Sequence, residues 1–430
     1  MALPKKKKKI IIKKIVKVTK KTVKKTTSKK VVKKPLPKKI IKKIIPKTKT
    51  KTKTKTKTKV KIKIKAKVNL KKSVTKKAKY VPSLNRSDKN PILKPNINNS
   101  WESQAVINPG VVISNNKVHL FYRALGDDGV SRIGYAISDD GINFNDRLLY
   151  PAYIPPNFEA INSHSPHTSP ARLEFNPQFY TSGGGWGGCE DPRAVIIEGR
   201  VYLTLNMFNG WHSMRVATVS IKEDDLLNMK WRWSDLVYLS KPGDRQKNWV
   251  LFPEKINGKF ALFHNLDKGD AKKVHIAYLD HLNMSQTPSG SDAPDPQCLP
   301  DHEVAWHNRT RSAAAPPIKT KYGWLLLYHA MEKNDHSRYK VGAMILDLKD
   351  PTQVLYRSVG PILEPDEWYE NDYKPGIVYA SGAVVKDGTL FVYYGGGDKY
   401  IACATAPLES FLQELMNQKI PKFSLNKTKL

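Results

Sequence analysis

The chain has 430 residues, and its 74 Lys and Arg against 38 Asp and Glu give a formal net charge of +36. The excess suggests a nucleic-acid-binding protein, but residues 1–80 alone hold 36 Lys, without any Arg, Asp or Glu. Subtracting those 36 from 74 leaves 38 basic residues to balance the 38 acidic residues of 81–430. The charge therefore says little about the substrate of this larger part.

Residues 1–80 form a Lys-rich tail, in which Lys alternates with Thr, Val, Ile or Ala over 49–68. Many like charges without counter-charges oppose a packed core, so we expect a solvated, disordered tail. Two interpretations stay open. The tail binds polyanions such as nucleic acid or acidic membranes without reading sequence, or it is a solvated appendage with no specific partner.

Apolar runs are short in this sequence, and the longest in the tail is Ile10–Ile12. We therefore expect no transmembrane segment and no signal peptide, which favours an intracellular protein that is not secreted. The three cysteines, Cys189, Cys298 and Cys403, are odd in number and widely spaced. That spacing argues against a disulfide framework and against a zinc site.

Residues 81–430 repeat one hairpin pattern five times: a turn, a strand rich in aromatic and branched residues, a polar gap and a second alternating strand. Copies two to five lie about 60 residues apart, and the first two lie about 80 apart. A short helix is expected at Leu408–Met416. The paired strands are expected at 117–123 with 131–138, 200–206 with 213–220, 259–265 with 273–279, 323–329 with 339–346, and 389–395 with 400–405.

A hairpin repeat of this size predicts an all-β fold: a five-bladed β-propeller over 81–430, preceded by the disordered Lys-rich tail of 1–80. The alternative is a β-sandwich with irregular hairpins. Blade ends converge on the axis of a propeller, so residues that close equivalent strands should meet there in a polar site. These residues are Arg123, Asn206, Asn265, His329 and Gly395.

The segment Gly187–Arg193, with the sequence Gly-Gly-Cys-Glu-Asp-Pro-Arg, is the strongest candidate for chemistry. Asp191 precedes a proline, which biases its backbone away from the helical region, and the adjacent glycines leave space for a ligand. Arg193 is placed to orient a carboxylate. Taken alone, the segment is equally consistent with a turn held by a structural Asp–Arg pair.

Four further segments occur around this one in a fixed order: Trp101–Gly110 leading into Tyr122–Ala124, Lys247–Lys259, Pro316–His329 and Tyr393–Asp398. Together with Gly187–Arg193 they resemble glycoside hydrolase family 130, the β-mannoside phosphorylases and related mannosidases. The resemblance runs from about residue 85 to about residue 415. It implies a five-bladed propeller with a sugar site on its axis.

The resemblance also implies roles for individual residues. Asp191 matches the family's general acid, whose proton reaches the leaving oxygen through a sugar hydroxyl while inorganic phosphate attacks the anomeric carbon with inversion. Phosphate is then the co-substrate, mannose 1-phosphate the product, and no cofactor or metal is expected. An anionic nucleophile needs no protein base, so one acid suffices. Asn108, Arg123 and Asp398 match residues that hold the transferred mannosyl unit, and Lys247, His329 and Tyr339 match residues that bind phosphate; Arg245 and Arg311 are further cations nearby.

One position departs from the phosphorylase pattern. Asn265 stands where these enzymes usually carry an arginine, and an amide cannot give the charged, bidentate grip of a guanidinium. Water is therefore an alternative acceptor, in an inverting β-mannosidase whose base would be Glu254, Glu370 or Asp372. A third interpretation is a carbohydrate-binding propeller without activity.

The stretch Pro151–Trp186, between the first two hairpins, is predicted to form a loop over the site. Its His164 and His167 have a His-x-x-His spacing, but no third ligand is evident, so metal binding is not expected. Aromatic side chains that could stack on sugar faces are Trp101, Trp186 and Trp368, whereas Trp324 lies within a strand and is expected in the core.

Overall fold

The computed structural model describes residues 82–155, 175, 180, 182–210, 213–243, 246–268, 271–283, 285, 306–307, 309–332 and 335–418. Side chains at 265–268, 271–275, 309–311 and 336 are outside this description. So are the tail of 1–80, His164, His167, Arg245 and Cys298. The predictions made for these positions stay predictions.

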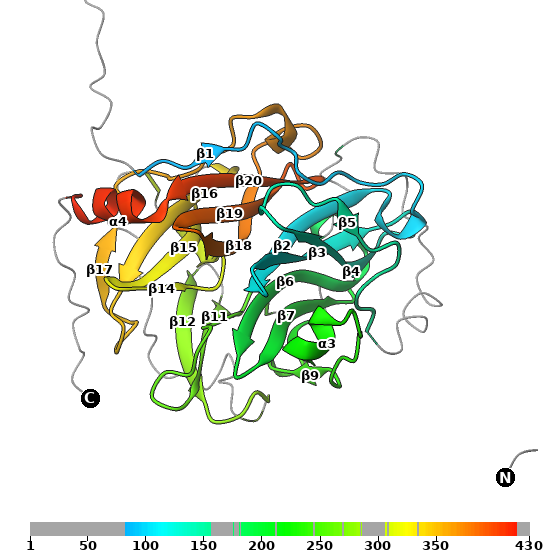
Figure 1. The fold of residues 1–430 in the computed structure, drawn as a ribbon, viewed down its shortest axis with the longest axis horizontal. Coiled ribbons are helices and arrows are strands. Elements are labelled where there is room, and N and C mark those ends of the chain that lie inside the picture. Colours follow the sequence, from blue (N-terminus) through cyan, green and yellow to red (C-terminus); the bar gives the residue numbers. More distant parts are fainter. Residues whose placement is uncertain are drawn as a thin grey trace, which may run out of the picture. The chain divides into compact units, whose positions relative to one another are not determined.

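Strands dominate the described residues, and all five expected hairpins are present (Figure 1). The predicted helix is confirmed as α4 (Leu408–Met416), and one short helix that was not expected, α3 (Glu223–Leu227), follows the second hairpin. The hairpins are β3 (Lys117–Leu125) with β4 (Val130–Ser138), β7 (Arg200–Phe208) with β8 (Met214–Lys222), β11 (Phe260–Lys268) with β12 (Ala271–Leu279), β15 (Gly323–Glu332) with β16 (Asp335–Leu346), and β19 (Thr389–Gly396) with β20 (Tyr400–Pro407).

Each hairpin gains a first strand, antiparallel to it, that the sequence analysis did not separate from the loops. These first strands are β2 (Ala105–Ser114), β6 (Gly187–Ile197), β10 (Val250–Leu251), β13 (Arg309–Ala313) and β18 (Val378–Lys386). We number the resulting groups sheets 1 to 5 in chain order. Short strands extend them: β5 (Asp146–Arg147), β9 (Val237–Tyr238), β14 (Ile318–Thr320), β17 (Val354–Arg357) and β1 (Asn85–Arg86).

Two strand pairings bear on how the sheets are arranged. A short parallel pairing of β4 with β6 joins sheets 1 and 2. The earliest described strand, β1, pairs antiparallel with β20, so it completes sheet 5 (Figure 1). The described part of the chain thus returns to its own beginning.

Apolar cores lie between consecutive sheets and follow the same cyclic order. Clusters join Phe121 of sheet 1 with Leu203 of sheet 2, and Leu327 of sheet 4 with Val392 of sheet 5. Similar clusters join sheets 2 and 3 and sheets 3 and 4, and a fifth joins sheet 5 back to sheet 1. Trp324 is fully buried and packs edge-on against Phe252 at 5.2 Å, which confirms it as a core residue.

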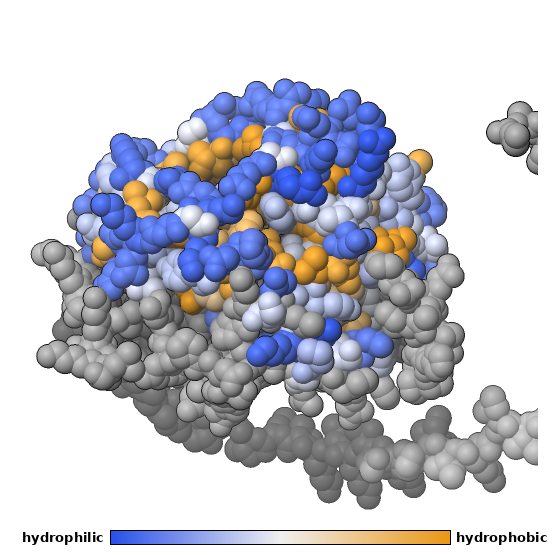
Figure 2. All heavy atoms as spheres, turned by 90° about the horizontal axis from the view of Figure 1, so that it is seen from below, coloured by the Kyte–Doolittle hydropathy of each residue, from blue (hydrophilic) through white to orange (hydrophobic). Residues whose placement is uncertain are grey.

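The surface outside these cores is mostly hydrophilic on the face shown in Figure 2, where apolar side chains are scattered between polar ones. Among the described residues, no helix has the length and apolar character needed to cross a bilayer.

The first strands of the sheets lie close to one another. Ser381 Oγ of β18 donates a 3.0 Å hydrogen bond to the carbonyl of Pro109 in β2. A methyl group on Gly110 of β2 would approach the backbone of β6 to 2.9 Å. Arg193 Nε of β6 donates a 2.7 Å bond to the carbonyl of Ala314, just after β13. The first strands therefore gather in the middle of the described fold.

Four of these first strands are interrupted by a β-bulge. The register shifts lie between Ile107 and Gly110, Glu190 and Arg193, Thr310 and Ser312, and Ala380 and Gly382. A bulge leaves a residue unpaired and redirects its side chain, which is why bulges are common beside active sites. The residues inside the four bulges are Asn108 with Pro109, Asp191 with Pro192, Arg311, and Ser381.

Candidate active site

Asp191 lies in the bulge of β6, with a positive φ of 49°. This left-handed backbone is uncommon for residues other than glycine, and such strained residues cluster at functional sites. Its carboxylate is nearly buried and accepts hydrogen bonds from Asn108 Nδ2 at 2.7 Å and from Asn206 Nδ2 at 3.3 Å. The bulge of one sheet thus presents its acid to side chains of two sheets.

Asn108 occupies the equivalent bulge of β2 and has the same unusual backbone, with φ 51°. Its amide nitrogen binds Asp191, whereas Asn108 Oδ1 is buried without a hydrogen-bond partner among the described residues. This oxygen lies where a side chain on Gly395 would begin, since a Cβ built on Gly395 would be 2.3 Å away. Gly395 therefore makes room for Asn108.

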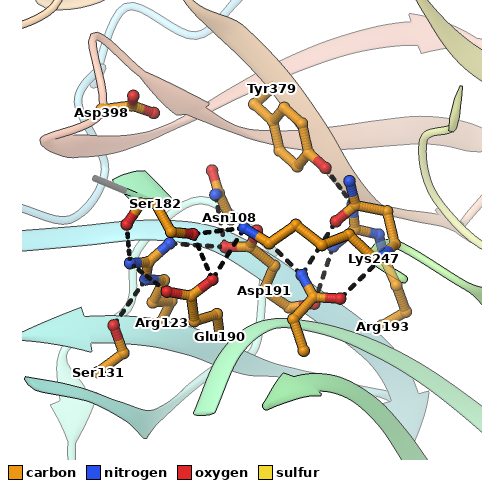
Figure 3. A network of polar contacts seen from close by, with 12 residues as sticks. Asn108, Arg123, Ser131, Ser182, Glu190, Asp191, Arg193, Lys247, Tyr379 and Asp398 are labelled. Atoms are coloured by element: carbon orange, nitrogen blue, oxygen red, sulfur yellow. Dashed lines mark hydrogen bonds and ion pairs between the residues drawn. The ribbon is translucent and has the colours of Figure 1, made fainter. Parts of the chain in front are cut away.

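Arg123 is almost completely buried and connects the two acidic residues of the motif (Figure 3). Its Nη2 lies 3.0 Å from Glu190 Oε1 and its Nη1 lies 3.4 Å from Asp191 Oδ1. Arg123 Nε also donates to Ser131 Oγ at 2.9 Å, and Nη2 donates to the carbonyl of Ser182 at 2.6 Å. These contacts fix the plane of the guanidinium beside the Asp191 carboxylate.

Lys247 approaches the same place from the segment before β10. Its ammonium lies 3.0 Å from Glu190 Oε2 and also donates to the hydroxyl of Ser182 (Figure 3). The Ser182 hydroxyl in turn donates to Glu190 Oε2 at 2.5 Å. Arg123 and Lys247, which the resemblance assigns to sugar and to phosphate, are therefore joined by Glu190.

The pKa of Asp191 reflects two opposed effects. Burial raises it, because a charged carboxylate loses its hydration, but the positive charges of Arg123, Lys247 and Arg193 and the bond from Asn108 outweigh burial. The net direction is a pKa below the ordinary value of an aspartate. In the ligand-free protein the Asp191 carboxylate is therefore ionised at neutral pH.

His329 and Tyr339 lie near each other, with ring centroids 6.4 Å apart, and both are close to Tyr379 of β18. The Tyr379 ring stacks on His329 at 4.2 Å, and its hydroxyl accepts a 3.1 Å bond from Arg193 Nη2. Burial raises the pKa of Tyr379 to about 12, so its phenol remains neutral. Tyr379 connects the predicted phosphate residues to the strand that carries Asp191.

Asp398 also has a positive φ, of 50°, and stands apart from this network in Figure 3. It lies 3.4 Å from Lys374 Nζ and accepts a hydrogen bond from the Tyr180 hydroxyl. Its charge nevertheless acts on the Arg123 guanidinium. Asp398 is thus near the site but not directly bonded to Asp191.

The three carboxylates considered as hydrolytic bases are all engaged by other groups. Glu254 lies on the surface, 2.6 Å from Lys319 Nζ. Glu370 is buried against Arg86 at 2.8 Å, and Asp372 is 2.7 Å from Lys399 Nζ. None of these contacts involves Asp191.

The tryptophans proposed to stack on sugars differ in how exposed they are. Trp368 is 56% exposed beside Tyr400, as a stacking surface requires. Trp101 is half-buried and donates to the carbonyl of Leu149 at 3.1 Å. Trp186 is half-buried and its backbone bonds Gly129. Their roles in sugar binding stay predictions.

Four residues of the network are not singled out by the sequence pattern: Ser131, Ser182, Glu190 and Tyr379. In the sequence, Glu190 is distinguished only as the neighbour of Asp191. Neighbouring residues of a regular strand point to opposite faces, so Glu190 and Asp191 would be expected on different sides. A bulge changes this alternation and lets both approach the same cations, but the sequence does not show where the bulge lies. Among the described residues, no group of three or more His, Cys, Asp or Glu is arranged to hold a metal.

Comparisons with known proteins identify the family of this chain. A family model described as β-1,4-mannooligosaccharide phosphorylase, glycoside hydrolase family 130, matches residues 165–417, more than half of the chain. A 1,2-β-oligomannan phosphorylase of Thermoanaerobacter sp. (strain X514) is 33% identical over 75% of this chain and 96% of its own length. A β-1,2-mannobiose phosphorylase of the same organism is 34% identical over 76% of this chain and 98% of its own length.

Among solved structures, the β-1,2-mannobiose phosphorylase from Listeria innocua in complex with β-1,2-mannobiose superposes with a TM-score of 0.59. The match covers 78% of this chain and 99% of that protein at 24% identity, which shows a common fold. The resemblance seen in the sequence is thereby confirmed. The chain belongs to glycoside hydrolase family 130, a family of enzymes that act on β-mannosides.

Proposed function

We propose that this protein catalyses inverting phosphorolysis of β-mannosides, with Asp191 as its single general acid. The main observation behind the proposal is that Asp191, Asn108 and Arg123 lie together. Asn108 and Asp191 come from the bulges of β2 and β6, and Arg123 comes from β3. Lys247, from the segment before β10, joins them through Glu190. In the family these positions belong to the acid, the mannosyl site and the phosphate site.

The fold we propose is a five-bladed propeller, with sheets 1 to 5 as its blades and the site on its axis. Three observations support it. Apolar cores follow one another cyclically from sheet 1 to sheet 5 and back. The first strands of the sheets gather in the middle of the described fold. The strand β1 pairs with β20 of the last sheet and so covers an edge that could otherwise pair with another chain.

In the proposed reaction a phosphate oxygen forms a bond to the anomeric carbon while the glycosidic C–O bond breaks. The proton of Asp191 passes to the leaving oxygen through a sugar hydroxyl, as the family resemblance implies. Arg123 and Asn108 would hold the mannosyl unit and orient the acid. Lys247, with His329 and Tyr339, would hold phosphate, for which charge-assisted bonds are the strongest available.

Asp191 must be protonated to act, yet the free protein favours its charged form. A phosphate anion beside Lys247 would offset part of the positive charge that stabilises the carboxylate. Proton uptake by Asp191 would then accompany phosphate binding. This order suits a phosphorylase, because the acid becomes competent when the nucleophile is present.

The relatives that match over almost their whole length are named for β-1,2-linked mannosides. We therefore propose β-1,2-mannobiose and longer β-1,2-oligomannans as the substrates. Another named relative, from Ruminococcus albus, is a β-1,4-mannooligosaccharide phosphorylase, 30% identical over 51% of this chain. The β-1,4-linked disaccharide is the comparison substrate.

The second candidate is hydrolysis on the same scaffold, which Asn265 favours because it replaces a phosphate-binding arginine of the phosphorylases. The backbone of Asn265 in β11 pairs with Val274 of β12, but its side chain is outside the described part. Against hydrolysis, each candidate base is held in an ion pair elsewhere. A third candidate, a binding protein without activity, predicts sugar binding without turnover.

The experiment incubates the full chain with β-1,2-mannobiose, with and without phosphate, and measures mannose 1-phosphate and free mannose. Phosphorolysis gives mannose 1-phosphate only when phosphate is present. Asp191→Asn should lower its rate by about 10²- to 10⁴-fold, the usual contribution of a general acid. The matched carboxylate control, Glu409→Gln, lies on the exposed side of α4 and should keep the wild-type rate. Equal amounts of free mannose in both incubations would establish the hydrolase instead.

For the tail of 1–80 we propose non-specific binding to polyanions, which its 36 Lys without any acidic residue support. Binding of the full chain to a DNA duplex should weaken steeply between about 50 and 200 mM salt, whereas a chain lacking 1–80 should not bind. Affinity that does not change with salt would contradict the proposal. We also propose that the protein acts inside the cell.

A further inference from the structure

Glu190 is the most completely enclosed acidic residue of the site, with no exposed surface. One carboxylate oxygen faces Arg123 at 3.0 Å, and the other faces Lys247 at 3.0 Å and accepts from Ser182 at 2.5 Å. It therefore divides its charge between two cations that approach from different sheets. Burial of a carboxylate is costly unless it is paired, so these contacts account for its position.

Asp191 competes for the same cations. Arg123 lies 3.4 Å from Asp191 Oδ1, and the charge of Lys247 also acts on Asp191. The groups that act on Asp191 come from several elements: Arg123 of β3, Lys247 before β10, Tyr379 of β18, Arg193 of β6 itself, and the uncharged amides of Asn108 and Asn206. Glu190 is a carboxylate paired with both Arg123 and Lys247, whereas Asp398 acts on Arg123 without an ion pair to it among the described contacts.

We propose that Glu190 is a positioning residue for the acid. Its negative charge offsets part of the positive charge of Arg123 and Lys247. The ionised form of Asp191 is then stabilised less strongly by these cations, so Asp191 can accept the proton that it must donate. The proposal rests on the proposed function, because it concerns the acid of that reaction.

Physical reasoning gives the sign of the effect. A like charge near a carboxylate disfavours ionisation, and an opposite charge favours it. With Glu190 made neutral, two cations would face Asp191 without their other counter-charge. The anionic form of Asp191 would gain stability, and a lower pH would be needed to protonate it.

The first test compares the pH profile of kcat, measured at saturating phosphate and mannoside so that it reports the acid in the substrate complex, for the wild type and for Glu190→Gln. Activity that needs protonated Asp191 falls as the pH rises, and this alkaline limb should move to lower pH by about one unit in the variant, the order expected for one neighbouring charge. At the pH of the wild-type limb, this equals about a tenfold loss of rate. The titration of phosphate is the same in both enzymes, so the difference belongs to the protein.

Ser182→Ala is the matched control. It removes a hydroxyl that contacts both Glu190 and Lys247 but leaves every charge and the carbonyl that binds Arg123. Its alkaline limb should stay in place even where its rate falls. A limb that moves equally in both variants, or in neither, would overturn the proposal and leave Glu190 a packing residue.

A second readout needs no turnover. Lys247→Met removes one of the cations that lower the pKa of Asp191, so Asp191 should titrate at a higher pH in this variant than in the wild type. Carboxyl-carbon NMR of aspartate-labelled protein, assigned with Asp191→Asn, then compares Lys247→Met with the double variant Glu190→Gln/Lys247→Met. Asp191 should titrate at lower pH in the double variant; an unchanged or higher midpoint contradicts the proposal.

The two hypotheses fail separately. Absence of turnover in the wild type with any β-mannoside rejects the proposed function, and the NMR comparison still decides the role of Glu190. If Glu190→Gln alone does not fold, the double variant remains informative, because removing both partners of a buried pair is tolerated better than removing one.

Discussion

At the scale of single residues, the site depends on side chains whose backbones are held in an uncommon conformation. Asn108 and Asp191 both have φ near 50°, and a 2.7 Å hydrogen bond joins their side chains. A non-glycine residue in this region costs about 1–3 kcal/mol. The surrounding contacts must therefore hold these residues in place.

Gly395→Ala tests how closely Asn108 is held. The added Cβ would lie 2.3 Å from Asn108 Oδ1, so the amide must move and its bond to Asp191 must lengthen. We expect KM for the mannoside to rise about tenfold, with a loss of about 1–3 kcal/mol in the free energy of unfolding. Steady-state kinetics and urea unfolding measure the two effects.

The double variant Asn108→Ala/Gly395→Ala is the control, since truncating the amide removes the 2.3 Å contact and leaves only a 3.1 Å approach to the Asn108 backbone nitrogen. Its KM should equal that of Asn108→Ala, which is the non-additivity expected of residues in contact. Additive effects would show that Gly395 acts through another neighbour.

At the scale of elements, the bulges are what the sequence could not supply. The ten hairpin strands were predictable because aromatic and branched residues alternate in them. The first strands β2 and β6 were not separated, because Asn-Pro and Asp-Pro interrupt the alternation and resemble turns. The proposed acid, Asp191, lies at one of those interruptions and is found from the sequence, whereas Glu190 and Tyr379, which contact the cations around it, are not.

Gly110→Ala tests the close approach of β2 and β6. Its Cβ would lie 2.9 Å from Ala194 N and 2.9 Å from Pro192 O, backbone atoms that cannot rotate away. The strands must separate, so we expect a loss of about 1–3 kcal/mol in stability, together with a fall in kcat. The fall follows because the Asn108–Asp191 bond crosses the same contact.

Val112→Ala, on the same strand, is the matched control. It leaves a cavity in the core between sheets 1 and 2 but does not push the strands apart. It should lower the unfolding free energy by a similar amount and keep kcat. If both variants lose kcat in proportion to stability, the approach of the strands has no specific role.

At the scale of the whole described fold, the earliest strand, β1, is attached to the last sheet through its pairing with β20. Arg86 of β1 bonds Glu370 at 2.8 and 3.0 Å, and Glu370 is fully buried with Tyr394 as a further donor at 2.8 Å. From the sequence, Glu370 was a candidate base. Its partner lies 284 positions away, and such a long-range pair leaves no local pattern to read.

Arg86→Ala should therefore destabilise the protein by weakening the attachment of β1. It leaves the buried Glu370 without its cation, which costs about 3 kcal/mol by analogy with other broken buried pairs. The double variant Arg86→Met/Glu370→Gln should lose less. Lys399→Ala breaks a partly exposed pair with Asp372 and should lose less than about 1 kcal/mol; equal losses in urea unfolding would contradict this account.

The bulges have one more consequence, for how such a scaffold can change its chemistry. A residue inside a bulge makes no ladder pair, so replacing it leaves the register of its sheet intact. Bulges of this kind interrupt the first strands of four sheets, and two of them carry Asn108 and Asp191. A single substitution at such a position can introduce a new acid, amide or cation, while the strands that support it keep their pairing.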